Sequence, residues 1–241
     1  MDIRLALMTG TDIPIPECQL TMHQPSVKEI AYIGENDFFK GVQTLCLNKS
    51  MFVQEGKTVP ENITNFYIFM TIVGEKQTAD KAEAVKQVLA LVFPQYKIMF
   101  SPQSIIFQKD QETYLVDENN FEQLQVTLRE VFCSKSGPMD QQAFNPANQK
   151  AREIAEKLMR GRQRVAEQNG SANASVFSQY LSTLSIGLHI PVGELEKYTM
   201  FQLFDSMERY LLYINWDIDI RSRLAGAKPD GKPDNWMKNI H

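Results

Sequence analysis

Apolar residues recur at three- and four-residue intervals through much of the first half of the chain, the spacing of an α-helix that buries one face. The first such segment opens on Ser26, with Glu29 three residues later, the pattern of a capping box that starts a helix. Gly34 is expected to divide this segment into two helices. The same spacing predicts further helices over residues 62–73 and 78–93.

Other parts of the first half have the pattern of strands. Residues 3–8 and 18–23 are short β-compatible runs separated by turn-forming residues, and they could pair with each other. Between residues 96 and 116, apolar positions lie on both sides of a polar turn, which predicts a hairpin that could join them in one small sheet. Asp117 is then expected to cap a helix that ends near Phe132.

The second half of the chain has an almost wholly helical pattern. It predicts helices over residues 145–169, 176–188 and 200–224, with a short helical turn over 191–198. Gly187 is expected to let the middle helix end.

These patterns divide the chain into four segments. Residues 1–133 are expected to form an α+β domain, 134–145 a linker, 146–225 a helical domain and 226–241 an extended tail. The predicted fold class is therefore α+β, with helices and a small antiparallel sheet in the N-terminal half and a mostly α-helical C-terminal half.

Composition and charge exclude several classes of function. The chain has 241 residues, 43% of them hydrophobic, so a core of normal size is available. Its net charge of −4 argues against general nucleic-acid binding, which needs a basic surface. The first residues lack the pattern of a signal peptide, and no apolar run approaches the about 18 residues of a membrane span. We therefore expect no membrane partner.

The cysteines give no sign of a disulfide framework. Cys18, Cys46 and Cys133 are odd in number, widely spaced and set among apolar residues. They are expected to be reduced and packed as small hydrophobic side chains, which indicates a cytosol-like compartment.

No group of residues points to catalysis, a cofactor or a metal ion. His23, His189 and His241 lie far apart, without neighbouring ligands at the spacing that a zinc site requires. The glycine-rich loops that bind phosphate and the motif of a nucleophile elbow are both absent. The sequence therefore predicts a protein that is not an enzyme.

Two carboxylates near the end of the long helix could in principle do acid–base work. Asp217 and Asp219 lie on different faces of a helix, and each has an arginine four residues later, Arg221 and Arg223. Surface ion pairs are the expected role, with catalysis and partner contact as the alternatives.

The helix predicted over residues 146–168 carries six basic and three acidic residues and has only a thin apolar stripe. A solvated surface, an acidic protein partner and nucleic acid are the three interpretations, and Arg160 and Arg164 are the candidate contacts. The missing aromatic residues, which would stack on bases, weaken the nucleic-acid interpretation.

The helix over 200–224 begins with a second capping box, formed by Thr199 and Gln202, and has a wide apolar face. Trp216 extends that face around the helix. Such a helix is either buried on several sides or offers one side to a partner.

The tail combines an extended arm with an aromatic end. Residues 226–234 repeat a Lys-Pro-Asp unit that is not compatible with a helix or a central strand. Trp236, Met237 and Ile240 follow. This group could fold back onto the chain or insert into a pocket of another protein, since aromatic anchors dominate interface energetics.

Five segments together resemble a known class of proteins. They are YTMFQLFDSMERY at 198–210, IDIRSRLAGAK at 218–228, PDNWM at 233–237, PSVKEI at 25–30 and DENNF at 117–121. They are similar to assembly chaperones and baseplate-hub assembly proteins of long-tailed bacteriophages.

The resemblance implies a non-enzymatic role in building a phage tail or baseplate, with no catalytic residues to carry over. The expected partners are other phage tail or baseplate proteins, or further copies of the same chain. The expected location is the host cytoplasm, with the virion as a second location. The alternative function is a permanent structural subunit of the virion, in the baseplate, the connector or the capsid.

Overall fold

The computed structural model describes residues 2–49, 60, 63–132, 175–227, 231–233 and 235–237. Along the chain the elements are α1 (Ile3–Thr9), β1 (Ile13–Ile15), η1 (Pro16–Cys18), β2 (Leu20–Met22), α2 (Val27–Ile33), α3 (Glu35–Leu45), α5 (Asn65–Gly74), η2 (Lys76–Thr78), α6 (Ala79–Val92), β3 (Lys97–Ser101), β4 (Ser104–Lys109), β5 (Glu112–Val116), α7 (Phe121–Phe132), α9 (Val176–Leu188), α10 (Val192–Leu195) and α11 (Met200–Leu224). Helices dominate and both small antiparallel sheets lie in the N-terminal half, which confirms the α+β class.

The predicted strand over residues 3–8 is wrong, because these residues form the helix α1. The Asp2 carboxylate accepts hydrogen bonds from the backbone N–H groups of Arg4 and Leu5, at 3.0 and 3.2 Å. Gly10 ends the helix with a positive φ of 67°. A side-chain cap at one end and a left-handed glycine at the other outweigh the short apolar pattern between them.

The first sheet is a hairpin in which β1 pairs with β2, with Ile13 opposite Met22. The partner of the predicted 18–23 run is therefore Ile13–Ile15, not residues 3–8. The expectation that these runs join the later hairpin is also wrong, since the two sheets are separate.

The second sheet has three antiparallel strands in the order β3-β4-β5, one more than the predicted hairpin. Two turns of two residues connect them, since Ser101 pairs with Ser104 and Lys109 with Glu112. The inner face of the sheet enters the core with the fully buried Ile105, Phe107 and Val116.

Most predicted helices are confirmed. Both branches of the Ser26–Glu29 capping box are present, and Gly34, with φ at 88°, separates α2 from α3. Asp117 does not cap α7 directly. Its carboxylate accepts the N–H of Asn119 at 2.8 Å, and the helix begins at Phe121, so Asp117 forms the turn before the helix.

In the C-terminal half, α9 and α11 have the predicted bounds. Gly187, however, does not end α9, which closes with His189 in the left-handed region. A Cβ on Gly187 would lie 2.2 Å from the hydroxyl oxygen of Tyr210. The glycine therefore allows α9 to approach α11 closely.

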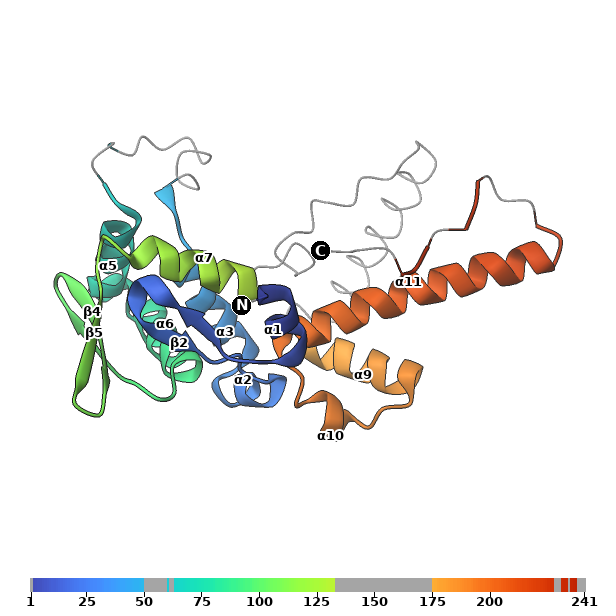
Figure 1. Cartoon of the computed structure of the whole chain (residues 1–241), viewed down its shortest axis with the longest axis horizontal. Coiled ribbons are helices and arrows are strands. Elements are labelled where there is room, and N and C mark those ends of the chain that lie inside the picture. Colours follow the sequence, from blue (N-terminus) through green and yellow to red (C-terminus); the bar gives the residue numbers. More distant parts are fainter. Residues whose placement is uncertain are drawn as a thin grey trace.

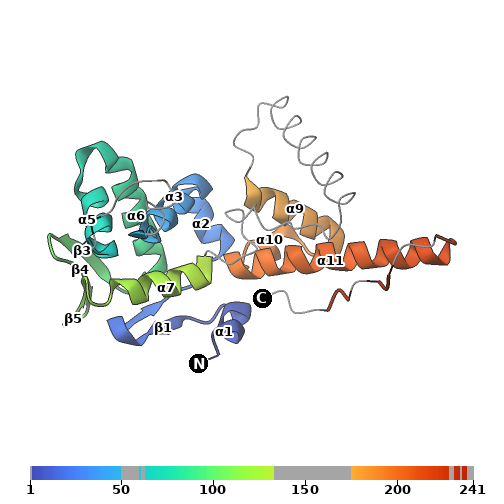
Figure 2. The ribbon, with the colours of Figure 1, turned by 90° about the horizontal axis from the view of Figure 1, so that it is seen from above.

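The start of α11 is tied to the N-terminal half. Thr199 forms an isolated β-bridge with Ser26, and the N–H of Val27 donates to the carbonyl of Tyr198 at 2.8 Å. The hydrophobic core includes buried residues of both halves. Figures 1 and 2 show the three-stranded sheet at one end of the molecule and α11 extending away at the other. The predicted linker lies outside the described residues, so the division into domains stays a prediction.

Candidate functional site

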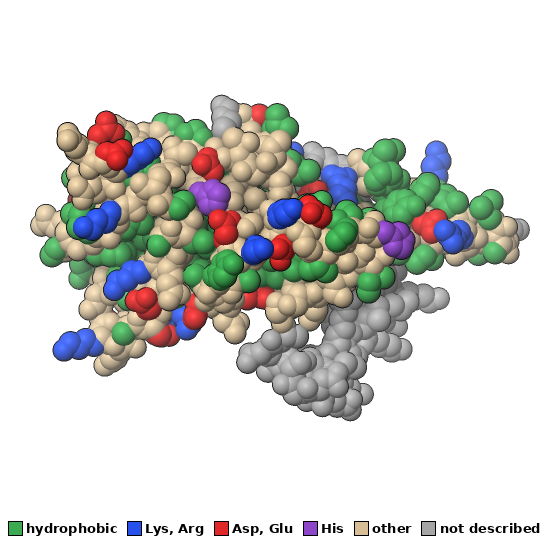
Figure 3. Space-filling view, turned by 90° about the horizontal axis from the view of Figure 1, so that it is seen from below, with side chains coloured by type: hydrophobic (Ala, Val, Ile, Leu, Met, Phe, Trp, Pro, Cys, Tyr) green, Lys and Arg blue, Asp and Glu red, His purple; other side chains and the backbone are tan. Residues whose placement is uncertain are grey.

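The far half of α11 stands out because all of its residues are at least partly exposed. Five of the first six residues of α11, up to Asp205, are buried, whereas every residue from 206 to 224 is at least partly exposed. Helix α9 packs on this first half. The ring centroids of Phe177 and Tyr180 in α9 lie 6.0 and 5.0 Å from that of Phe204 in α11. In the view from below, hydrophobic side chains gather at the right-hand end, where α11 projects (Figure 3).

Three residues on this part of α11 form what we call the outer apolar face: Leu211, Ile214 and Ile218. Their spacing of three and four residues places them on one side of the helix. Leu211 is 48% and Ile218 57% exposed, and Leu224 at the helix end is 83% exposed. A row of exposed apolar side chains on a helix is typical of a protein-binding surface.

A different side of the same helix holds the tail. The Arg209 guanidinium donates a hydrogen bond to the backbone carbonyl of Trp236 at 3.3 Å. The ring of Trp236 meets that of Tyr213 edge to face, with centroids 5.6 Å apart, and Tyr213 lies 6.2 Å from Trp216. The tail thus folds back onto α11, while Met237 beside it is 67% exposed.

The carboxylates Asp217 and Asp219 form the predicted ion pairs. Asp217 contacts Arg221 at 2.8 Å and Asp219 contacts Arg223 at 3.1 Å, each four residues apart. Pairs of this kind stabilise a helix by a few tenths of a kcal/mol each. They lie on the projecting half of α11 and help to keep it helical.

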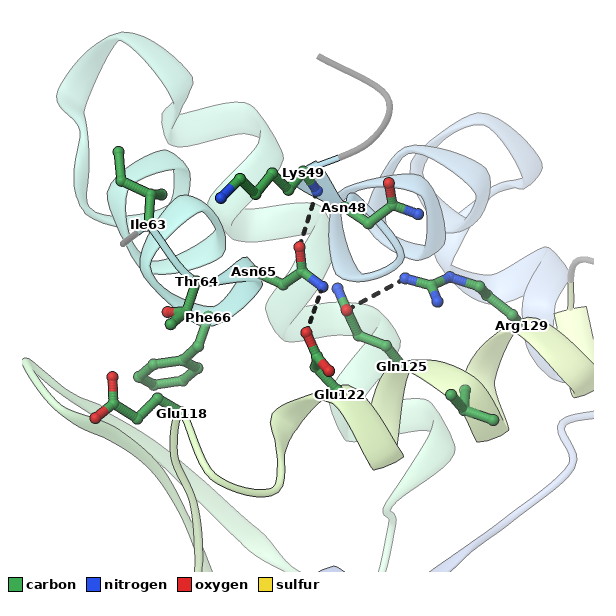
Figure 4. A pocket seen from close by; sticks show the side chains of 11 residues that line it. Asn48, Lys49, Ile63, Thr64, Asn65, Phe66, Glu118, Glu122, Gln125 and Arg129 are labelled. Atoms are coloured by element: carbon green, nitrogen blue, oxygen red, sulfur yellow. Dashed lines mark hydrogen bonds between the residues drawn. The ribbon is translucent and has the colours of Figure 1, made fainter. Parts of the chain in front are cut away.

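A second candidate site is a pocket of about 530 Å³ between the end of α3, the start of α5 and α7. Its polar groups contact one another, as Figure 4 shows: the backbone N–H of Lys49 donates to Asn65, and Asn65 donates to Glu122. The buried Gln125 and the neighbouring Arg129 donate to backbone carbonyls at and just after the end of α3, at 2.7 and 3.2 Å. Gln125 and Arg129 thus provide hydrogen bonds to carbonyl groups that have no partner within the helix at the end of α3, which is a structural role.

The rest of the described chain offers little that could carry chemistry. His23 lies between Asp12 and Glu29, at 3.1 and 3.6 Å, but this group is on the surface. Within the ranges that the structure describes, no group of three or more His, Cys, Asp or Glu is placed to hold a metal ion. None of the helices in those ranges combines the length and the apolar character needed to cross a membrane.

Comparison with known protein families gives a match for the C-terminal part of the chain. Residues 169–241 match the family model described as YomV second domain. The matched segment contains α9, α10, α11 and the tail, and so the whole candidate surface. This family is phage-derived, and the match suggests a phage origin for the chain. Neither the curated proteins nor the solved structures gave a match.

Within the matched segment, two of the predicted contact residues, Trp216 and Trp236, both have their rings close to that of Tyr213. Met237 lies beside them. Ile240, Arg160 and Arg164 lie outside the described residues, so their roles stay predictions.

The part played by Arg209 and Tyr213 in holding the tail was not predicted. Both lie on the same side of the helix as Trp216, at intervals of four and three residues, and this spacing is the signal that could have identified them.

Proposed function

We propose that the protein is a bacteriophage tail or baseplate assembly protein that acts through protein–protein contacts and not as an enzyme. Its partners are other tail or baseplate proteins of the same phage, which it meets in the host cytoplasm. Two features support this: the similarity of residues 169–241 to a phage-derived family, and the resemblance of 198–210 to tail and baseplate assembly proteins.

The observation that carries the proposal is the exposure of the outer apolar face on a helix that projects from the body. Fully burying an isoleucine side chain contributes about 1.5–3 kcal/mol. Ile218 is 57% exposed, so a partner that covers it would gain roughly 1 kcal/mol from this residue, on the order of a tenfold change in affinity. Met237 is also exposed, next to Trp236, which packs on a different side of α11.

The test uses the phage that encodes the protein, with its own gene inactivated and variants supplied from a plasmid. Wild-type protein should restore tails visible by electron microscopy, and Ile218→Glu should not. Tyr32→Glu is the matched control, because Tyr32 is 82% exposed on α2 and is not part of the projecting half of α11. Normal tail numbers without the gene, or full restoration by Ile218→Glu, would refute the proposal.

A permanent structural subunit of the virion is the alternative. Mass spectrometry of purified virions separates the two. A subunit is present at fixed copy number, whereas an assembly protein is found in the infected-cell lysate and absent from finished particles.

A further inference from the structure

The outer edge of β3 in the three-stranded sheet is not paired with any other described strand. In the order β3-β4-β5, β3 and β5 are the edge strands, and η1 packs against β5. Among the described residues, no backbone hydrogen bond joins the outer edge of β3 to any other segment. An unpaired strand edge is a template for another strand.

The register shows which backbone groups this edge offers. Ser101 and Ser104 close a two-residue turn, so they form a hydrogen-bonded pair of the ladder. In an antiparallel ladder the groups of alternate residues point to alternate sides. Those of Ser101, Met99 and Lys97 therefore point to β4. The N–H and C=O groups of Ile98 and Phe100 point to the open edge.

We propose that this edge binds the same edge of a second copy of the chain, so that two β3 strands pair antiparallel across a twofold axis at Met99. Ile98 of each copy then lies opposite Phe100 of the other. Because both residues offer their backbone groups outward, the pairing forms hydrogen bonds at each of the two Ile98–Phe100 pairs. The Met99 side chains meet between them as the close, non-hydrogen-bonded pair.

The choice of axis follows from the sequence of the strand. Residues directly opposite each other in an antiparallel pair point to the same face, so a twofold axis must pass through a residue and not between two. An axis through Phe100 would place Ile98 opposite Pro102, which has no N–H to donate. An axis through Ile98 would leave Ser101 beyond the paired strand. Only Met99 pairs all five residues of β3.

The side chains also fit a second copy. On the outer face, Met99, Ile106 and Leu115 form one apolar row across the three strands, with Met99 38% and Leu115 51% exposed. Pairing through Met99 makes this row continuous across six strands. The single charge on β3, Lys97, faces Ser101 of the other copy, so no like charges meet within the strand pair.

A groove of about 560 Å³ runs along β3, where it is lined by Ile98, Met99 and Phe100, and is bordered by Ala90 and Lys86 of α6. Ile98 and Phe100 line it and are only partly buried. In the pair, the Ile98 and Phe100 side chains of the second copy reach this groove. The partner is thus a strand with apolar residues at alternate positions, which β3 itself provides.

This inference does not rest on the proposed function. The sheet and the projecting end of α11 lie at opposite ends of the molecule (Figures 1 and 2), so pairing through β3 leaves the outer apolar face accessible. A failure of one proposal therefore says nothing against the other.

Sedimentation velocity of the full-length protein over a range of concentrations tests the proposal. The wild type should pass from monomer to dimer. Met99→Glu places two carboxylates opposite each other and should weaken the dimer at least about tenfold, as should Met99→Lys. An equimolar mixture of the two should dimerise again, because the opposite charges then pair. Leu115→Glu, the same change on the same face of β5, should leave the dimer intact.

A wild type that stays monomeric up to about 100 μM, where micromolar association is nearly complete, overturns the proposal. So does a mixture of the two charged variants that stays monomeric, or a dimer that Met99→Glu does not weaken. Met99→Cys keeps the proposal testable should the charged variants not fold. It should form a disulfide-linked dimer under mild oxidation, and Leu115→Cys should not.

Discussion

Gly41 lies where α3 crosses α6, and its replacement by alanine tests how closely these helices approach. A Cβ at Gly41 would lie 2.5 Å from the carbonyl oxygen of Ala84 and 2.6 Å from Cγ2 of Val88. A change of rotamer could relieve the contact with Val88. It cannot relieve the contact with a backbone oxygen, so α3 and α6 must move apart.

The cost follows from two opposing effects. Over-packing a close-packed core costs about 1–3 kcal/mol. Alanine in a helix gains up to about 1 kcal/mol over glycine. We therefore expect Gly41→Ala to lower the free energy of unfolding by roughly 1–2 kcal/mol. For a chain of this size that corresponds to a Tm lower by about 2–8 °C.

Urea unfolding followed by far-UV circular dichroism measures this loss, and Gly74→Ala is the matched control. Gly74 is the last residue of α5, and a Cβ there would meet no atom within 4 Å. The control should be as stable as the wild type or slightly more stable. If Gly41→Ala behaves like Gly74→Ala, the helices do not approach as closely as described, and the argument from the Ala84 carbonyl fails.

Two further predictions concern titratable groups. Burial raises the pKa of Glu29, but hydrogen bonds from Ser26 and the contact with His23 outweigh it and hold the pKa below its ordinary value of 4.5. This lowered pKa contributes stability above pH 4.5 that is lost as the pH falls through the folded-state pKa. Glutamine in the Glu29→Gln variant can keep the capping box but does not titrate. The urea midpoint of the variant should therefore fall less on acidification than that of the wild type, and an equal fall in both proteins would contradict the prediction. Burial, with a smaller contribution from the charge of Glu17, raises the pKa of the Cys18 thiol to about 11. Its thiolate is then about 100-fold rarer than for an ordinary thiol, so iodoacetamide should modify Cys18 only in the unfolded protein. Peptide mass mapping locates the modified cysteine, and rapid labelling of Cys18 in the native protein would contradict this prediction.

The parts of the fold that the sequence predicted well are those determined by neighbouring residues. Both capping boxes form because the two side chains involved are three residues apart, a distance that any helix start satisfies. The buried side of α6 follows in the same way from its periodic spacing: Ala82, Val85, Val88, Leu89 and Val92 recur at helical intervals and are all buried.

The failures are in short segments, where local patterns are ambiguous. Seven residues at 3–9 fit a strand or a helix equally well by period, and the Asp2 cap decides between them. Pro14 has the pattern of a break, yet it lies in β1 because an edge strand tolerates proline. The extra strand beyond the predicted hairpin depends on a two-residue turn after Ser101 that the apolar pattern does not mark.

The candidate site shows a different limit of sequence analysis. The sequence of the tail allowed both fold-back and partner capture, because an aromatic residue after an extended arm can pack on its own chain or on another protein. Fold-back depends on the side of α11 that carries Arg209, which donates a hydrogen bond to the Trp236 carbonyl, and Tyr213, whose ring meets that of Trp236. Both lie more than twenty residues earlier in the chain. Contacts at such sequence separation depend on how the whole domain folds, which periodicity does not report.

The outer apolar face is exposed because α11 is longer than α9, and the sequence predicts this difference in length. The 25 residues of α11 extend roughly 37 Å, whereas the 13 residues of α9, the described helix beside it, extend about 20 Å. α9 therefore covers only about half of α11, although the apolar spacing continues through Leu211, Ile214 and Ile218. The Asp217–Arg221 and Asp219–Arg223 ion pairs and the contact between the Tyr213 and Trp216 rings help to keep this projecting half helical. Because the backbone of these residues is already helical, a partner that covers them does not have to order the chain first, which favours binding.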